Sequence, residues 1–111
     1  MYEREVEVFR ALGDPIRLTI LGMLRVREAC VCELVERLPV SQPAVSQHLR
    51  KLKDARLVCE RRYKSWIYYR IREDLPRTVA SVIEGLACSA EDEEWLKQNQ
   101  VGTSCETLLD R

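Results

Sequence analysis

The sequence lacks the features that would assign it to several broad classes of protein. Its 111 residues include one Phe, four Gly and four Pro, with no Pro/Gly-rich linker, repeat or low-complexity tract. No apolar run approaches the roughly 20 residues of a membrane-spanning helix, and residues 1–5 do not resemble the start of a signal peptide. We therefore expect one compact cytoplasmic domain with no membrane partner.

Several kinds of catalytic and metal site are also missing. His48 is the only histidine, which excludes a histidine-rich zinc site within one chain. It lies on the helix expected to contact DNA, so no Ser/His/Asp set is expected either. No cysteines are spaced as Cys-x-x-Cys, so a zinc ribbon is not expected. Cys105 and Arg111 have the spacing of a thiol phosphatase or arsenate reductase loop, but the residues between them include acids and no glycine to cradle an oxyanion. We expect a protein that is not an enzyme and holds no permanent cofactor.

The net charge of zero conceals an uneven distribution of charge along the chain. Residues 37–72 carry ten Lys and Arg against two acids, a net charge of +8. Residues 1–36 have a net charge of −2 and residues 73–111 one of −6. A basic segment between acidic ones is typical of a polyanion-binding surface, although a solvated basic face is the alternative.

Hydrophobic periodicity predicts a mainly α-helical fold with one small β-hairpin. Asp14 followed by Pro15 marks the start of a helix, and Ser41 marks the start of another. Two strands rich in aromatic and β-branched residues come later, separated by a cationic turn over residues 62–64. The expected elements are helices over residues 3–12, 15 to at least 24, 31–38, 42–54 and 74–88, strands over 57–61 and 65–71, and a further turn over 91–98.

The two short helices over residues 31–38 and 42–54 indicate a helix-turn-helix, and the hairpin after them indicates a wing. Amide and hydroxyl groups suit base edges in the major groove, whereas Lys and Arg suit phosphates. His48 fits either a DNA contact or a partly packed position, and a pure interaction module is the alternative to a DNA-binding protein. The residues expected to contact double-stranded DNA are Ser41, Gln42, Pro43, Ser46, Gln47, His48, Arg50, Lys51, Arg61, Arg62, Tyr63 and Lys64.

Three longer stretches occur in an order and spacing that resemble a known family. Residues 12–21 (LGDPIRLTIL), 46–52 (SQHLRKL) and 61–70 (RRYKSWIYYR) are together similar to the ArsR family of metal- and metalloid-responsive winged-helix repressors. The resemblance implies a homodimer that reads a palindromic operator, with one winged-helix domain over residues 1–89 and an acidic tail over 90–111. It places the first and last helices at the dimer interface, where the expected residues are Val6, Phe9, Val79, Val82, Ile83 and Leu86.

The segment over residues 28–34 (EACVCEL) closely resembles the arsenic-binding motif of that family. The expected ligands are Cys30 and Cys32, and the implied inducer is As(III) or Sb(III), because soft thiolates select thiophilic ions. A third cysteine often stands where this chain has Val35, so either the third sulfur comes from Cys59, Cys88, Cys105 or an external thiol, or coordination stops at two sulfurs. Cys59 also fits a small core residue.

The spacing of Cys30 and Cys32 predicts how binding would be transmitted. On a regular helix, residues i and i+2 point about 200° apart, so two sulfurs share an ion only where the first turn is distorted. The same helix supports the expected recognition helix, so we expect metalloid binding to misplace that helix and release DNA. A winged-helix repressor that responds to another thiophilic metal or to thiol oxidation is the alternative.

Overall fold

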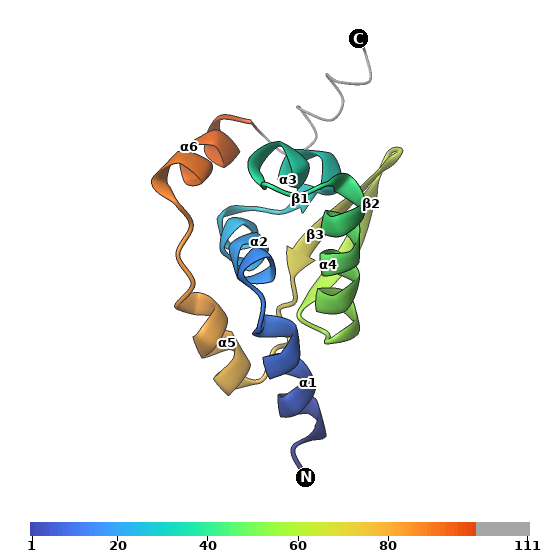
Figure 1. Cartoon of the computed structure of the whole chain (residues 1–111), viewed down its shortest axis with the longest axis vertical. Coiled ribbons are helices and arrows are strands. Elements are labelled where there is room, and N and C mark those ends of the chain that lie inside the picture. The colour runs from blue at the N-terminus through green and yellow to red at the C-terminus, as the bar shows by residue number, and fades with distance from the viewer. Residues whose placement is uncertain (100–111) are drawn as a thin grey trace.

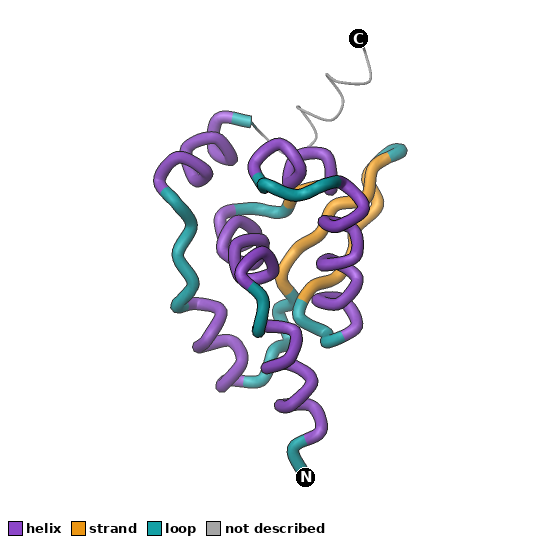
Figure 2. Tube along the Cα trace, viewed as in Figure 1, coloured by secondary structure: helices purple, strands orange, loops and turns teal. Residues whose placement is uncertain are grey.

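The computed structural model describes residues 1–99 and shows helices packed around a small sheet (Figures 1 and 2). Six helices and three strands lie within those residues, which confirms the predicted winged helix-turn-helix architecture. The elements are α1 (Glu3–Leu12), α2 (Pro15–Val26), β1 (Ala29–Cys30), α3 (Val31–Arg37), α4 (Gln42–Asp54), β2 (Val58–Tyr63), β3 (Trp66–Ile71), α5 (Arg77–Glu84) and α6 (Ala90–Gln98).

The two predicted helix caps are confirmed. Asp14 Oδ1 accepts hydrogen bonds from the backbone N–H groups of Ile16 and Arg17, at 2.8 and 3.1 Å, and Pro15 occupies the first turn of α2. Ser41 Oγ accepts from the N–H of Ala44 at 3.3 Å at the start of α4. Each cap satisfies N–H groups that the helix itself leaves without a partner.

The sheet has three antiparallel strands in the order β1-β3-β2. The sequence did not predict β1, because a strand of two residues is too short to show a period. The hairpin turn is also shorter than expected, since Tyr63 pairs with Trp66 and leaves only Lys64 and Ser65 between the strands. Lys64 adopts a left-handed φ of 56°, which a two-residue hairpin turn commonly requires.

The core is centred on α2, which lies between α5 and α6 on one side and α4 and the hairpin on the other (Figure 1). Ile20, Leu21 and Met23 of α2 have no exposed surface, and neither have Leu49 of α4 and Leu96 of α6. Helix α6 therefore belongs to the same core as the winged helix, although it falls in the segment that the sequence suggests as a tail.

The helix expected over residues 74–88 is wrong at both ends. Helix α5 covers only Arg77–Glu84, because Pro76 occupies its N-cap position and Gly85 its C-cap position. The chain then crosses α2 so closely that a Cβ atom on Gly22 would lie 2.7 Å from the Ala87 carbonyl oxygen. A glycine at position 22 is therefore what allows this segment to lie against α2.

None of the helices in residues 1–99 is both long enough and apolar enough to cross a membrane.

Candidate nucleic-acid interface and cysteine site

Helix α4 carries the residues that the sequence assigns to base and phosphate contacts. Val45, Leu49 and Leu52 are fully buried and hold the helix against the core. The other faces of the helix and its cap are open to solvent. The predicted contact residues that are exposed there are Ser41, Gln42, Pro43, Ser46, Gln47, Arg50 and Lys51.

The tip of the wing presents a second group of predicted contacts. Arg62, Tyr63 and Lys64 are exposed, and the Lys64 ammonium lies 5.4 Å from the centre of the Tyr63 ring. The hairpin runs beside α4 and extends beyond the body of the molecule (Figure 1). Helix α4 and the hairpin with the cationic tip thus lie side by side. This is the arrangement of a winged-helix DNA-binding surface.

His48 packs inward rather than toward the outer face of α4. Its Nδ1 accepts a hydrogen bond from Arg17 Nη1 at 3.2 Å and lies 4.0 Å from the Asp14 carboxylate. Arg17 is itself buried and donates to the backbone carbonyls of Ala11 and Arg10, at 2.6 and 3.2 Å. Of the two interpretations of His48, the structure favours the partly packed one.

Arg61 also lies in a different environment from the other predicted phosphate contacts. It pairs through two nitrogens with the Glu28 carboxylate, and its Nε lies 3.0 Å from Glu28 Oε2. Its guanidinium also lies over the rings of Tyr63 and Tyr68, 5.6 and 5.5 Å from their centres. Arg61 is therefore bound within the protein in this state, unlike its exposed neighbour Arg62.

Cys30 and Cys32 lie at the junction of β1 and α3. Cys30 is extended, with φ −94° and ψ 167°, and is the N-cap residue of α3, whereas Cys32 lies in its first turn. Their Sγ atoms are 3.0 Å apart. The two cysteines therefore do not lie on one regular helical turn, because the chain changes from strand to helix at Cys30 and this change brings the sulfurs together.

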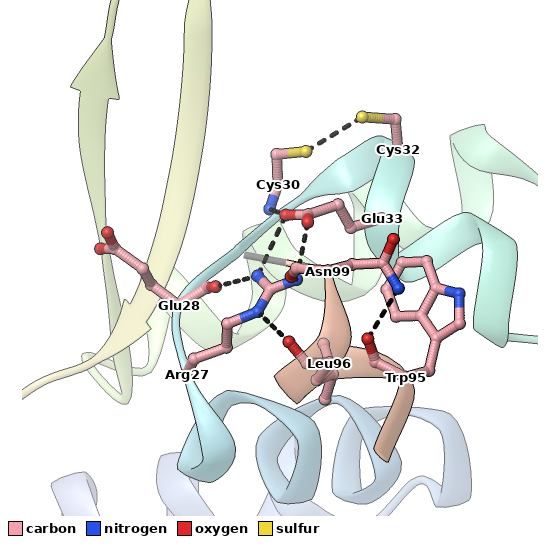
Figure 3. A network of polar contacts seen from close by, with 8 residues as sticks. All are labelled: Arg27, Glu28, Cys30, Cys32, Glu33, Trp95, Leu96 and Asn99. Atoms are coloured by element: carbon pink, nitrogen blue, oxygen red, sulfur yellow. Dashed lines mark hydrogen bonds and ion pairs between the residues drawn. The ribbon is translucent and has the colours of Figure 1, made fainter. Parts of the chain in front are cut away.

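A buried ion pair supports this junction from below (Figure 3). The Glu33 side chain has no exposed surface, accepts a hydrogen bond from the Cys30 N–H at 3.1 Å, and pairs with Arg27 at 2.7 Å. Arg27 also donates to the backbone carbonyls of Glu28, at 2.6 Å, and of Leu96, at 2.8 Å. One arginine thereby ties the cysteine site to helix α6.

Helix α6 has a second attachment to α3. Arg37, in the last turn of α3, donates from Nε to Asp92 Oδ1 at 2.8 Å, and its guanidinium lies 5.6 Å from the centre of the Trp95 ring. Both ends of α3 are therefore linked to α6, through Glu33 and Arg27 at one end and Arg37 at the other.

Arg27 and Glu33 are not among the site residues predicted from the sequence. Cys30 and Glu33 have the N-cap and N3 spacing of a capping box, which is a usable signal for Glu33. No local pattern identifies Arg27, because its contact with Leu96 joins residues 69 positions apart in the chain.

In the part of the chain that the structure describes, no third ligand lies beside Cys30 and Cys32. Within residues 1–99, no group of three or more His, Cys, Asp or Glu side chains is arranged to hold a metal ion. Cys59 lies on β2 opposite Arg70, and Cys88 lies between α5 and α6. Cys105, like Arg111, lies outside the described residues.

The predicted dimer-interface residues divide into two groups. Val6, Phe9 and Val82 are large apolar side chains left exposed, at 45, 57 and 39% of their surface. Val79 and Ile83 instead pack in the core of this chain, and Leu86 lies partly buried beyond the end of α5. The exposed group lines a groove between α1 and α5.

Comparisons with known proteins identify relatives of this chain. A model described as "Bacterial regulatory protein, arsR family" matches residues 14–59. The chain is 38% identical over 91 residues to an arsenic resistance transcriptional regulator of Pseudomonas putida, covering 80% of this chain and 69% of that protein. It is 32% identical over 102 residues to the arsenical resistance operon repressor of Escherichia coli, covering 90% and 87%.

A solved structure shares the fold as well. It is the solution structure of a homodimeric winged helix-turn-helix DNA-binding domain from Mycobacterium bovis, described as a possible ArsR-family transcriptional regulator. The match has a TM-score of 0.65 and 33% sequence identity, and it covers 72% of this chain and 75% of that one.

Proposed function

Because the chain belongs to the ArsR family of bacterial regulatory proteins, we propose that it is an arsenic(III)- or antimony(III)-responsive repressor. In this proposal it binds operator DNA as a dimer and leaves the DNA when the metalloid binds Cys30 and Cys32. The observation that carries the proposal is the 3.0 Å separation of the two sulfur atoms. The named relatives are transcriptional regulators, and the chain is a regulator rather than an enzyme.

The chemistry of the cysteine pair supports a thiophilic ligand. Two sulfurs that each lie roughly 2.3 Å from one ion, as in a zinc thiolate, are at most about 4.6 Å apart, and Cys30 and Cys32 already meet that limit. Arsenous acid would react without a change of oxidation state. Each As–S bond would replace one As–OH bond, and the thiol proton and the leaving hydroxide would form water.

The third sulfur remains a prediction among the candidates already named. Cys59 and Cys88 do not join Cys30 and Cys32 in the described residues, which leaves Cys105 or an external thiol as the candidates that we favour. The described chain ends beside the site, since Asn99 accepts a hydrogen bond from Arg27. Cys105 is six positions beyond Asn99, and an extended chain over six residue steps reaches about 20 Å.

The DNA side of the proposal assigns two kinds of contact. Gln42, Ser46 and Gln47 are exposed on α4 and can donate to or accept from base edges. The exposed cations of α4 and of the wing tip would bind phosphates and make the affinity depend on salt. Dimerisation through the groove between α1 and α5 would present two such helices to a palindromic site.

A different trigger at the same cysteines is the second candidate. The short distance between the sulfurs also suits another thiophilic ion, or oxidation, in which the two thiols lose two protons and two electrons to an oxidant such as peroxide. The protein would remain a DNA-binding switch in either case.

Titration of arsenite into the protein–operator complex tests the proposal. Arsenite should release the wild-type protein, and Cys30→Ser and Cys32→Ser should remain bound, because each removes one of the two sulfurs. Cys59→Ser is the matched control and should respond like the wild type, whereas loss of the response in Cys105→Ser would identify the third ligand. Release of Cys30→Ser by arsenite would contradict the proposal, and release by peroxide alone would favour the second candidate.

A further inference from the structure

The sheet has two different faces, and the cysteine site belongs to the one turned away from the main core. Cys30 lies opposite Tyr68, and Tyr68 lies opposite Arg61 on the next strand. Side chains of directly opposed residues share a face, so these three project from the same side of the sheet. The neighbouring residues Tyr69 and Ile71 pack instead against the main core.

Tyr68 connects the cysteines to the wing on this outer face. Its side chain has no exposed surface and forms a small cluster with Cys30, against which Cys32 and Trp66 pack. The Tyr63 ring meets the Tyr68 ring edge-on, with 6.3 Å between centres. A change in the position of Cys30 is therefore a change in the packing of a wing strand.

The Glu28–Arg61 pair closes over this cluster. Both guanidinium nitrogens on one edge of Arg61 bind the Glu28 carboxylate, and the same guanidinium lies over Tyr68 and Tyr63. The pair is partly shielded, with 39% of the Arg61 side chain and 22% of the Glu28 side chain exposed. A bidentate, partly desolvated pair stacked on aromatic rings holds its geometry better than an open surface ion pair.

The geometry points to the Glu28–Arg61 pair as the connection through which the state of Cys30 and Cys32 reaches the wing. Glu28 is two residues before Cys30, and β1 is only two residues long. An ion placed between the two sulfurs would change their 3.0 Å separation and shift β1, which carries Cys30. Glu28 would move with β1 and no longer hold β2 through Arg61. The wing arrangement that the pair stabilises would then belong to the ion-free, DNA-binding state.

This inference rests on the proposed function and adds a route to it. A movement of α3 would change the position of α4 directly, because the two helices are in contact. The Glu28–Arg61 pair would instead change the position of the wing. Breaking the pair should therefore lower the coupling between metalloid and DNA without removing either binding site, because neither residue is a sulfur ligand or an exposed residue of α4. Glu28 and Arg61 are positioning residues in this sense.

Two variants break the pair differently. Glu28→Gln removes the charge, and Arg61→Lys keeps the positive charge of the wing but cannot form two parallel hydrogen bonds. For each, operator affinity is measured with and without saturating arsenite, and arsenite affinity is measured on the DNA-free protein. We expect the arsenite-induced loss of operator affinity to shrink about fivefold or more, with arsenite affinity within about twofold of wild type.

Arg62→Gln is the matched control, because Arg62 is the exposed neighbour on the same strand. It should weaken operator binding equally with and without arsenite. The ratio of operator affinity without arsenite to that with arsenite should therefore stay as in the wild type. A wild-type ratio in both Glu28→Gln and Arg61→Lys would overturn this inference alone. A wild-type protein that arsenite does not release from its operator would overturn the proposed function, and this inference with it.

Discussion

Glu33 shows how the cysteine site is held at the scale of single residues. Its carboxylate is completely buried, and burial of an unpaired carboxylate costs several kcal/mol. Arg27 compensates the charge, and the N–H of Cys30 supplies a further hydrogen bond. The backbone that carries the first sulfur is therefore positioned by a side chain that is itself fixed by the fold.

Cys88 provides a prediction at the same scale. Burial raises the pKa of its thiol, and the negative charges of Asp92 and Glu93 add to that effect. The thiolate fraction is then lower than in a free thiol, so Cys88 should react with iodoacetamide more slowly than N-acetylcysteine at pH 8. Mass spectrometry of the alkylated peptides measures the rate.

Denaturation is the control for the Cys88 prediction. In concentrated urea the burial and the nearby carboxylates no longer act on the thiol, so its alkylation rate should rise to that of N-acetylcysteine. Equal rates in native and denatured protein would show that Asp92, Glu93 and burial do not affect Cys88.

Individual residues also show where sequence reasoning stops. The exposed polar residues of α4 follow from a short-range pattern that the sequence displays, whereas Cys30 and Cys32 were identified by their resemblance to a family motif. Arg61 is predicted at the DNA surface because it is basic and lies among basic residues, and for His48 the sequence allows either a DNA contact or a partly packed position. Their partners, Glu28 and Arg17, lie 33 and 31 positions away, so no local pattern reveals them.

At the scale of elements, the start of α2 depends on one charged cap. The backbone N–H of Arg17, together with that of Ile16, lowers the pKa of Asp14, because both hydrogen bonds favour the carboxylate. A carboxylate with a lowered folded-state pKa stabilises the protein above the ordinary Asp pKa of about 3.9. That contribution is lost as the pH falls through the lowered value.

Asp14→Ala should therefore destabilise the protein in a pH-dependent way. Its free energy of unfolding, measured by urea denaturation, should fall below that of wild type at pH 7, and the difference should shrink as the pH approaches 3. Asp14→Ser keeps an uncharged acceptor and should show no such dependence relative to Asp14→Ala. A wild-type-to-alanine difference that is the same at pH 7 and pH 3.5 would contradict the assignment.

The short β1 and α3 elements decide the geometry of the cysteine pair. On a continuous helix, the side chains at positions 30 and 32 would point in different directions. On a continuous strand they would project from the same face, with their Cα atoms about 6.6 Å apart. The chain instead changes conformation at Cys30. This change depends on the pairing of β1 with β3, which a two-residue segment does not encode by itself.

For the whole molecule, the uneven charge of the sequence becomes a separation in space. The basic residues lie on α4 and the wing, whereas α6 opens with Glu91, Asp92 and Glu93 on the other side of α2 (Figure 1). Arg37 is the exception within the segment of net charge +8, since it pairs with Asp92 of α6, whereas the cations of α4 and the wing lie away from that acidic turn. This arrangement favours an oriented approach of a polyanion to one side of the protein.

The groove between α1 and α5 gives a prediction for the assembly. Phe9 is 57% exposed in the isolated chain and lines this groove. Phe9→Glu should shift the protein from dimer to monomer in sedimentation equilibrium, because a charge would have to be buried at the interface. The dimer dissociation constant should rise at least about tenfold, which corresponds to roughly 1.4 kcal/mol.

Glu7→Gln is the matched control for the assembly, because Glu7 is exposed on α1 and does not line this groove. It should leave the dimer intact. Thermal unfolding of Phe9→Glu at low concentration should resemble that of monomeric wild type, since Phe9 does not belong to the core. A dimer of wild-type strength in Phe9→Glu would place the interface elsewhere.

The sequence by itself determined the features that depend on neighbouring residues. The caps at Asp14 and Ser41, the apolar stripe of α4 and the hairpin all arise from hydrogen bonds or periodicities within a few positions. The exposed basic and polar residues of α4 follow from the same helical periodicity as its apolar stripe.

Only the tertiary structure decided how these parts are joined. It brought the two sulfurs together through β1, docked α6 against α3 through Arg27 and Arg37, and turned Arg61 toward Glu28 instead of toward solvent. The physical reason is that burial and ion pairing depend on which surfaces meet after the chain has folded back on itself. Contacts of that kind join residues tens of positions apart, and each side chain's type permits many partners besides the one it finds.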